Sequence, residues 1–180
     1  TIMQFQLSWD ISFYNAEGEW TLGILAECEI QKSSKNLADF ATVTLPEAHF
    51  NEVLNVQEKI KRGDRVKIRL GYDNNLVTEF EGYVKEILTN DSSLKIFCED
   101  GLFLFRNGVK NKQFKPATVS QIANYLISEI DSSFKLVCDY DIGYEKFTIY
   151  KATGFDVLKK IQEETGADIF FDRHIPIPQS

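Results

Sequence analysis

Apolar and polar residues alternate along most of the first hundred positions of the chain, which is the spacing expected of half-buried β-strands. In the stretch GDRVKIRLGYDNNLVTEFEGYVKEI, residues 63–87, two alternating runs flank the turn residues Asp73 to Asn75 and predict a β-hairpin. Similar runs predict six strands in about 100 residues, which is typical of a β-barrel or sandwich. The predicted strands are residues 3–15, 20–33, 38–46, 64–72, 78–88 and 93–100.

A helical period replaces this alternation in the second half of the chain. Apolar side chains at helical spacing predict a helix at residues 118–130, in which Thr118 is the N-cap and Gln121 completes a capping box. A second helix follows the cap Thr153 and ends at Gly166, since glycine adopts the left-handed conformation easily. Strand character is found in residues 134–141, 146–151 and 167–172. We expect the first two of these strands to pair with each other.

These elements predict a mainly β protein with an α+β part. The first 105 residues are expected to form a β-barrel, and residues 106–180 a small α+β domain. Between the third and fourth predicted strands, residues 47–64 form either a short helix or an ordered loop.

Composition places the chain among globular proteins. Its 180 residues are 43% hydrophobic and 13% aromatic, well above disordered chains. No apolar run reaches the roughly 18 residues of a membrane span, and the N-terminus has no export-signal pattern. Residues 1–105 hold 10 Lys+Arg and 17 Asp+Glu, whereas residues 106–180 hold 10 of each. The acidity of the first half argues against a surface there that binds nucleic acid.

Candidate catalytic and metal-ligating residues are few. Cys28, Cys98 and Cys138 are widely spaced among apolar residues, so we expect buried free thiols in a reducing compartment. A zinc site would require closely spaced Cys or His pairs, and the two histidines, His49 and His174, are far apart in sequence. Because no base lies beside a nucleophile and no glycine-rich phosphate loop is present, we predict no enzymatic activity, cofactor or metal.

The densest basic stretch, KIKRGDRVKIR at residues 59–69, has two interpretations. One is a patch that binds nucleic acid, and the other is the solvent face of a strand whose neighbour supplies Glu79 and Glu81. We favour the second interpretation because Arg65, Lys67 and Arg69 alternate with apolar residues.

The apolar segment LKIFCEDGLFLFRN, residues 94–107, departs from strict alternation. In a sheet with one solvent-exposed face, apolar and polar residues alternate more regularly, so we expect this segment to be covered on both sides. The cover comes either from the second domain or from a neighbouring subunit. In the second case the candidate interface residues are Phe97, Phe103 and Phe105.

The order of these motifs resembles that of the baseplate hub proteins of phage tails, the late control protein D family, and the related hub part of type VI secretion spikes. Each motif is loose by itself, and their shared order over about Asn36 to Asp172 carries the resemblance. The motifs are ADFATVTLP, GDRVKIRLGY, TEFEGYVKEI, LKIFCEDGLFLFRN, TVSQIANYLISEI and TGFDVLKKIQEETGADIFFD.

The resemblance implies a tube-forming β-barrel followed by a small α/β domain. It also implies trimers in which each chain supplies two barrels, giving a ring that joins the tail tube to the spike. The partners would be copies of the same chain, tube and spike proteins, and DNA that passes through the channel without specific binding. In the hairpin, Gly71 and Gly82 would let the strands bend, while Tyr72 and Tyr83 would pack near the strand ends.

The last residues, IPIPQS, fall where the family's chain would continue into a second barrel, so we expect either a longer protein or a shorter relative. We predict a structural protein of a phage or prophage tail hub, made in the bacterial cytoplasm and incorporated in the virion. The alternative is an isolated small barrel that binds oligosaccharide or single-stranded nucleic acid. A third function, a hydrolase, would need a pocket that joins His49 or His174 to a nucleophile.

Overall fold

The computed structural model describes seven segments and divides into two compact units. The first unit ends at Gly101 and the second begins at Leu102, so the domain boundary predicted after residue 105 falls among the first residues of the second unit. Of the segment 47–64, which we predicted to be a short helix or an ordered loop, residues 47–57 lie outside the described residues. The described segments are residues 7–32, 38–46, 58–89, 93–132, 134–138, 141–166 and 169–172.

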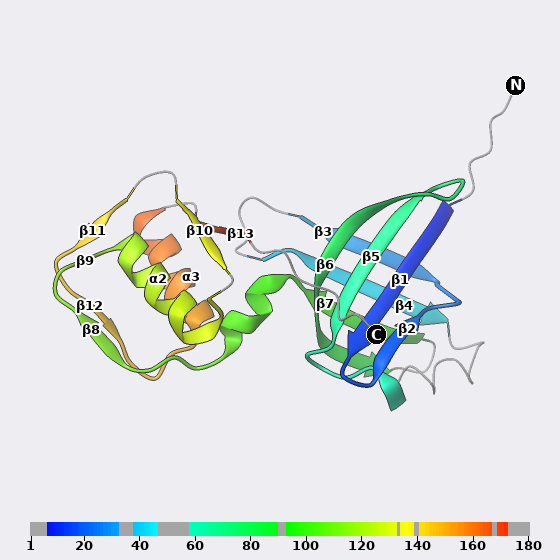
Figure 1. The fold of residues 1–180 in the computed structure, drawn as a ribbon, viewed down its shortest axis with the longest axis horizontal. Coiled ribbons are helices and arrows are strands. Elements are labelled where there is room, and N and C mark those ends of the chain that lie inside the picture. Colours follow the sequence, from blue (N-terminus) through cyan, green and yellow to red (C-terminus); the bar gives the residue numbers. More distant parts are fainter. Residues whose placement is uncertain are drawn as a thin grey trace, which may run out of the picture. The chain divides into compact units, whose positions relative to one another are not determined.

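The first unit contains one antiparallel sheet of seven strands, in the order β2-β1-β5-β6-β7-β4-β3 (Figure 1). Each predicted strand of the first hundred residues contributes to this sheet. Their bounds are β1 (Leu7–Asn15), β2 (Gly18–Thr21), β3 (Glu27–Gln31), β4 (Phe40–Pro46), β5 (Arg65–Tyr72), β6 (Asn75–Thr89) and β7 (Ser93–Glu99).

The prediction of a single strand at residues 20–33 is wrong, because this segment forms two strands on opposite edges of the sheet. The Leu22 amide donates to the Ile11 carbonyl at 2.9 Å, which continues β2 alongside β1. The Ala26 amide donates to the Thr44 carbonyl at 2.9 Å, which places the following strand beside β4. Both halves have strand character, so alternation alone does not reveal the change of partner.

This short connection requires the sheet to curve. Strands β2 and β3 are six strand spacings apart in the sheet order, or about 29 Å in a flat sheet. The chain from Thr21 to Glu27 spans at most about 22 Å. Figure 1 shows β3 and β4 passing behind β1 and β5. Among the described residues no pairing joins β2 to β3, so the structure shows a curved sheet and not the closed barrel that we predicted.

The concave side of this sheet encloses one apolar core. Alternate residues of β1, β4, β5, β6 and β7 point into it, as the period of two requires. Burying each aliphatic or aromatic side chain contributes about 1.5–3 kcal/mol. The buried members are Ile11, Phe13, Leu22, Ala41, Val43, Leu45, Ile60, Val66, Ile68, Phe80, Val84, Leu94, Ile96 and Cys98.

The hairpin of β5 and β6 turns at Asp73 and Asn74, whose φ values of 52° and 66° suit the tight turns that match strand twist. Gly82 is needed for a close approach: a Cβ there would collide with the Glu99 carbonyl of the neighbouring strand. Of the two hairpin tyrosines, Tyr83 is buried and Tyr72 is exposed. Close backbone contact therefore accounts for this glycine more directly than bending does.

The second unit packs two helices against three short strand pairs, β8 with β12, β9 with β11, and β10 with β13. The predicted pairing of 134–141 with 146–151 is therefore wrong, since each of these strands pairs with a more distant segment. The elements are η1 (Gly101–Arg106), β8 (Lys112–Phe114), β9 (Ala117–Thr118), α2 (Val119–Ile130), β10 (Lys135–Cys138), β11 (Gly143–Tyr144), β12 (Phe147–Ile149), α3 (Gly154–Thr165) and β13 (Ile169–Asp172).

Both helices begin and end as the sequence predicts. The Thr118 side chain accepts from the Gln121 amide, and the Gln121 side chain accepts from the Thr118 amide, which completes the capping box of α2. Thr153 caps α3 in the same way, with Asp156 as its partner. Gly166 ends α3 in the left-handed conformation, with φ of 65°.

Candidate interaction surfaces

The described residues offer little for catalysis. Within the described segments, no three His, Cys, Asp or Glu side chains are placed to hold a metal ion. In the same part of the chain no helix combines the length and apolar character needed to cross a membrane. The two histidines of the hydrolase alternative, His49 and His174, lie outside the described residues.

Two of the predicted free thiols belong to the apolar core of the sheet. Cys98 is buried and Cys28 is half-buried against the same core, and both are free, as predicted. Burial raises the pKa of Cys28 to about 11, and it raises the pKa of Cys98 further. Because the thiolate is the reactive form, both thiols act as small apolar residues near neutral pH. The side chain of Cys138 lies outside the described residues.

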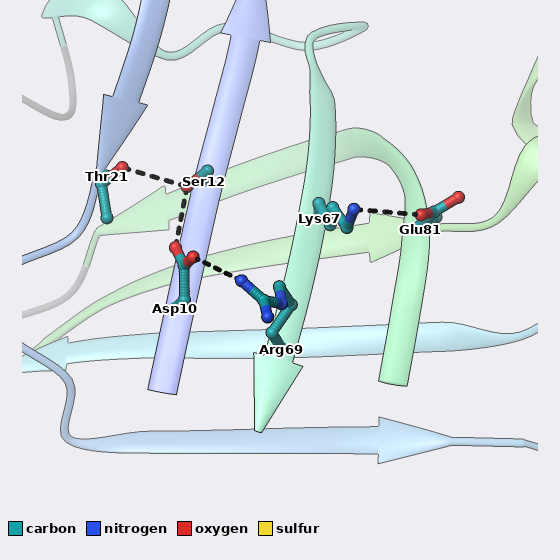
Figure 2. Close-up of polar contacts among 6 residues, drawn as sticks. All are labelled: Asp10, Ser12, Thr21, Lys67, Arg69 and Glu81. Atoms are coloured by element: carbon teal, nitrogen blue, oxygen red, sulfur yellow. Dashed lines mark hydrogen bonds and ion pairs between the residues drawn. The ribbon is translucent and has the colours of Figure 1, made fainter. Parts of the chain in front are cut away.

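The outer face of β1 and β5 carries a network of paired polar groups (Figure 2). Arg69 Nη1 lies 3.4 Å from Asp10 Oδ2, and Ser12 Oγ donates to Asp10 Oδ1 at 3.0 Å. A further hydrogen bond of 3.0 Å joins Ser12 Oγ to Thr21 Oγ1. Arg69 and Asp10 are direct cross-strand partners, as are Ser12 and Thr21, so strand register brings these groups together.

One predicted cross-strand pair on β5 and β6 is confirmed. Lys67 Nζ lies 3.8 Å from Glu81 Oε1, and the two residues face each other across the hairpin (Figure 2). Partly exposed ion pairs of this kind contribute only about 0–1 kcal/mol. Glu81 nevertheless gives the Lys67 cation a counter-charge within the protein, which weakens the interpretation of this strand as a nucleic-acid-binding patch.

The other predicted partner, Glu79, is displaced by a β-bulge. The register shifts between Ile68 and Arg69, so that Arg69 faces Thr78 and Glu79 becomes the extra residue of β6. Glu79 Oε2 instead lies 3.5 Å from Lys32 Nζ. The prediction that Glu79 pairs with a β5 cation is therefore wrong, because simple alternation cannot anticipate an inserted residue.

The apolar segment 94–107 is not a single strand. β7 ends at Glu99, and the following residues form the 3₁₀ helix η1, whose tighter turn accounts for the run of neighbouring apolar positions. Phe105 has no exposed surface, and its ring packs edge-on against Phe134 at 5.0 Å between centroids. Phe103 is also buried, whereas Phe97 is half-buried on the outer face of β7. The interface role of these residues stays a prediction, and Phe97 is the one that keeps accessible surface.

Phe97 belongs to a small apolar area on the outer face. Its cross-strand neighbours are Thr42 and Glu86, and Leu88, two residues beyond Glu86, is 48% exposed. Because alternate residues of a strand share a face, Leu88 lies on the same side as Phe97.

A second apolar area lies where β1, β5 and β6 extend past the core. Leu7, Tyr72 and Val77 are 52%, 59% and 61% exposed, although their register places them on the core-facing side of the sheet. Sequence reasoning missed them because alternation assigns such residues to the core. The only available signal is their position near strand ends, next to the Asp73–Asn74 turn.

Comparisons with known proteins find similarity at the level of fold. No protein-family model and no curated protein matches the chain. The crystal structure of the 43 kDa tail protein of prophage MuSo2 from Shewanella oneidensis superposes with a TM-score of 0.56 and 16% identity, covering 92% of this chain and 56% of that protein. The tail protein from Neisseria meningitidis MC58 gives 0.54 and 14%, covering 88% of this chain and 46% of that protein.

The chain thus spans about half the length of each of these proteins. At such low identity the comparison shows a shared fold, and it transfers no residue role.

Proposed function

We propose that this chain is a non-enzymatic structural component of a phage or prophage tail, made in the bacterial cytoplasm and built into the virion. The observation that carries the proposal is the fold shared with two tail proteins over 92% and 88% of the chain. The order of sequence motifs, which resembles that of tail hub proteins, supports the same function independently of the fold comparison. Function does not follow from fold alone, so the proposal needs a test in the particle.

Within the tail, we place the chain in the baseplate hub that joins the tube to the spike. The curved sheet of the first unit would form part of a barrel wall, completed by the edges of β2 and β3 or by another copy. Its outer face is consistent with DNA passing without specific binding, because Lys67 and Arg69 already have carboxylate partners at 3.8 and 3.4 Å. Tube proteins, spike proteins and further copies of the chain would be the partners.

The alternative of a small-barrel binding module has less support. Such modules combine a cationic groove with aromatic stacking platforms, whereas Lys67 and Arg69 on the outer face of β5 are paired with acidic residues. A cysteine hydrolase is also disfavoured at the two described thiols, since their raised pKa keeps them protonated at neutral pH.

Deleting the coding sequence from its phage or prophage tests the proposed function. We expect particles without complete tails, detected by negative-stain electron microscopy, and recovery when a plasmid supplies the protein. Mass spectrometry of purified particles should detect the chain, and cryo-electron microscopy should find its density where tube meets spike. Normal tails after deletion, together with absence of the chain from particles, would refute the structural role. Density elsewhere in the tail would refute only the hub position.

A further inference from the structure

Strands β8 and β12 of the second unit form a two-stranded ribbon with one face open. Phe147 and Ile149 are buried on the side that packs toward the helices, and the Phe114 ring contacts Tyr125 at 5.6 Å between centroids. The alternate residues Gln113 and Thr148 are exposed on the other side, where they face each other across the ribbon. Figure 1 shows β8 and β12 side by side.

The ribbon concentrates positive charge in an acidic protein. Residues 110–115 and 145–151 contain five Lys and one Glu, a balance of +4. Since the whole chain carries −7, the remaining residues carry −11. The five lysines, Lys110, Lys112, Lys115, Lys146 and Lys151, are all exposed. By alternation Lys115 and Lys146 share the open face with Gln113 and Thr148, whereas Lys112 lies opposite Ile149 on the face toward the helices. We call the two segments together the basic ribbon.

Strand pairing brings four of the ribbon lysines into two pairs, one at each end of the ribbon. Phe114 and Phe147 are cross-strand partners, so the adjoining Lys115 and Lys146 come together at one end of the ribbon. At the other end the Lys151 amide donates to Asn111 Oδ1 at 2.8 Å, which brings Lys151 near Lys110.

Like charges placed opposite each other destabilise a strand pair. Within the described segments no ion pair neutralises any of the five lysines. Aromatic rings supply part of the missing compensation, since Lys112 Nζ lies 4.9 Å from the Tyr125 ring and Lys151 Nζ 5.3 Å from the Tyr150 ring. The remaining repulsion would be relieved by an acidic partner.

The edge strand β3 offers a matching acidic surface. Glu27 and Glu29 are exposed on one face of this strand, about 7 Å apart along it. Their one described side-chain contact is a hydrogen bond of 3.2 Å from Gln31 Nε2 to Glu29 Oε1. The other edge strand is less suited, because Lys59 already lies beside it, 6.0 Å from the Trp20 ring.

We propose that the basic ribbon docks on Glu27 and Glu29 of strand β3 in a second copy of this chain. The two surfaces differ, so the contact is head-to-tail, and repeating it generates a ring or a filament. The inference rests on the proposed assembly of several copies in a tail, and it names the surfaces that would meet. A protein partner is favoured over nucleic acid because the chain is strongly acidic outside the ribbon.

Charge reversal of both surfaces in the full chain tests this contact. One variant carries Lys115→Glu with Lys146→Glu, and the other carries Glu27→Lys with Glu29→Lys. Sedimentation velocity across protein concentration, at about 0.05 M and about 0.5 M salt, measures self-association. We expect each variant alone to associate at least about tenfold more weakly than the parent, as high salt also should. An equal mixture of the two variants should recover association.

Matched controls separate this contact from a general charge effect. Lys61→Glu with Lys159→Glu changes the net charge as the ribbon variant does, but neither residue belongs to the ribbon, so association should persist. Circular dichroism verifies that each variant is folded. A fluorescein-labelled single-stranded oligonucleotide tests the rival partner, and binding that only the ribbon variant loses would assign the surface to nucleic acid and overturn the proposal.

Other outcomes also overturn it. Unchanged association of either reversed variant, or no recovery in the mixture, would mean that these two surfaces do not meet. A parent chain that stays monomeric at all concentrations but is present in purified tails would remove the ribbon contact while leaving the proposed function intact. Absence from the tails would remove the proposed function instead.

Discussion

Replacing Phe105 with alanine separates a core role of this residue from an interface role. Phe105 is fully buried, its ring meets that of Phe134 at 5.0 Å, and a Cβ built on Gly154 would lie 3.1 Å from its Cδ1 atom. Truncating such a ring removes buried apolar surface and leaves a cavity, at a cost of about 3–5 kcal/mol. A unit of about 70 residues has a free energy of unfolding of roughly 4–10 kcal/mol, so the second unit should lose much of its stability.

The chain provides separate probes for its two units. Both tryptophans, Trp9 and Trp20, belong to the first unit, whereas α2 and α3 belong to the second. In urea denaturation of the Phe105→Ala variant, we expect the far-ultraviolet circular dichroism of the helices to be lost at a midpoint roughly 2–3 M lower. The tryptophan fluorescence transition should stay where it is in the parent.

Two variants complete this experiment. Phe105→Leu keeps most of the volume and should cost less than about 1.5 kcal/mol. Phe97→Ser alters a half-buried residue on the outer face and should affect assembly more than unfolding. If Phe105→Ala left the helical transition in place and weakened only self-association, Phe105 would be an interface residue and the core argument would be wrong.

Further predictions concern close contacts, capping, titration and thiol reactivity. Gly82→Ala should destabilise the first unit by about 1–3 kcal/mol in urea denaturation, because the added Cβ meets a backbone carbonyl. A Cβ added at Gly108 has no atom within 4 Å, so the control Gly108→Ala should change stability by less than about 1 kcal/mol. Thr153→Ala should cost the second unit about 1 kcal/mol by circular dichroism, and an unchanged midpoint would argue against the cap. A hydrogen bond from the Ser120 backbone amide lowers the pKa of Asp141 in the folded protein. The ionised carboxylate therefore stabilises the fold above the ordinary carboxyl pKa, and this stabilisation is lost as pH falls through the lower folded value. Asp141→Asn should remove it, and a difference in unfolding free energy that does not change with pH would contradict this. With a pKa of about 11, Cys28 should be alkylated by iodoacetamide about tenfold faster per pH unit up to about pH 11, and a plateau near pH 8 would refute its burial.

Local signals in the sequence were sufficient for the helices. Thr118 and Gln121 are three residues apart at the start of an apolar period, and this spacing is what a capping box requires. Gly166 ends α3 because glycine has no Cβ to oppose positive φ. The Lys67–Glu81 pair was also predictable, since it depends only on hairpin register up to the bulge.

Interaction surfaces were harder to predict. The outer-face position of Phe97 follows from alternation, but the burial of Phe105 depends on Phe134, which lies 29 residues further along the chain. The basic ribbon arises because two separate segments, 110–115 and 145–151, become neighbours through β8 and β12. No short window of sequence contains both segments.

The amino-acid sequence by itself determined the two helices with their ends and the strand character of most of the first sheet, because these properties depend on residues within a few positions of one another. It also determined that the first half is acidic. The tertiary structure alone decided which strands pair, that residues 20–33 divide between two edges of the sheet, and that the lysines of the basic ribbon lie together. Pairing depends on contacts between distant segments, and alternation specifies a strand's faces but not its neighbour.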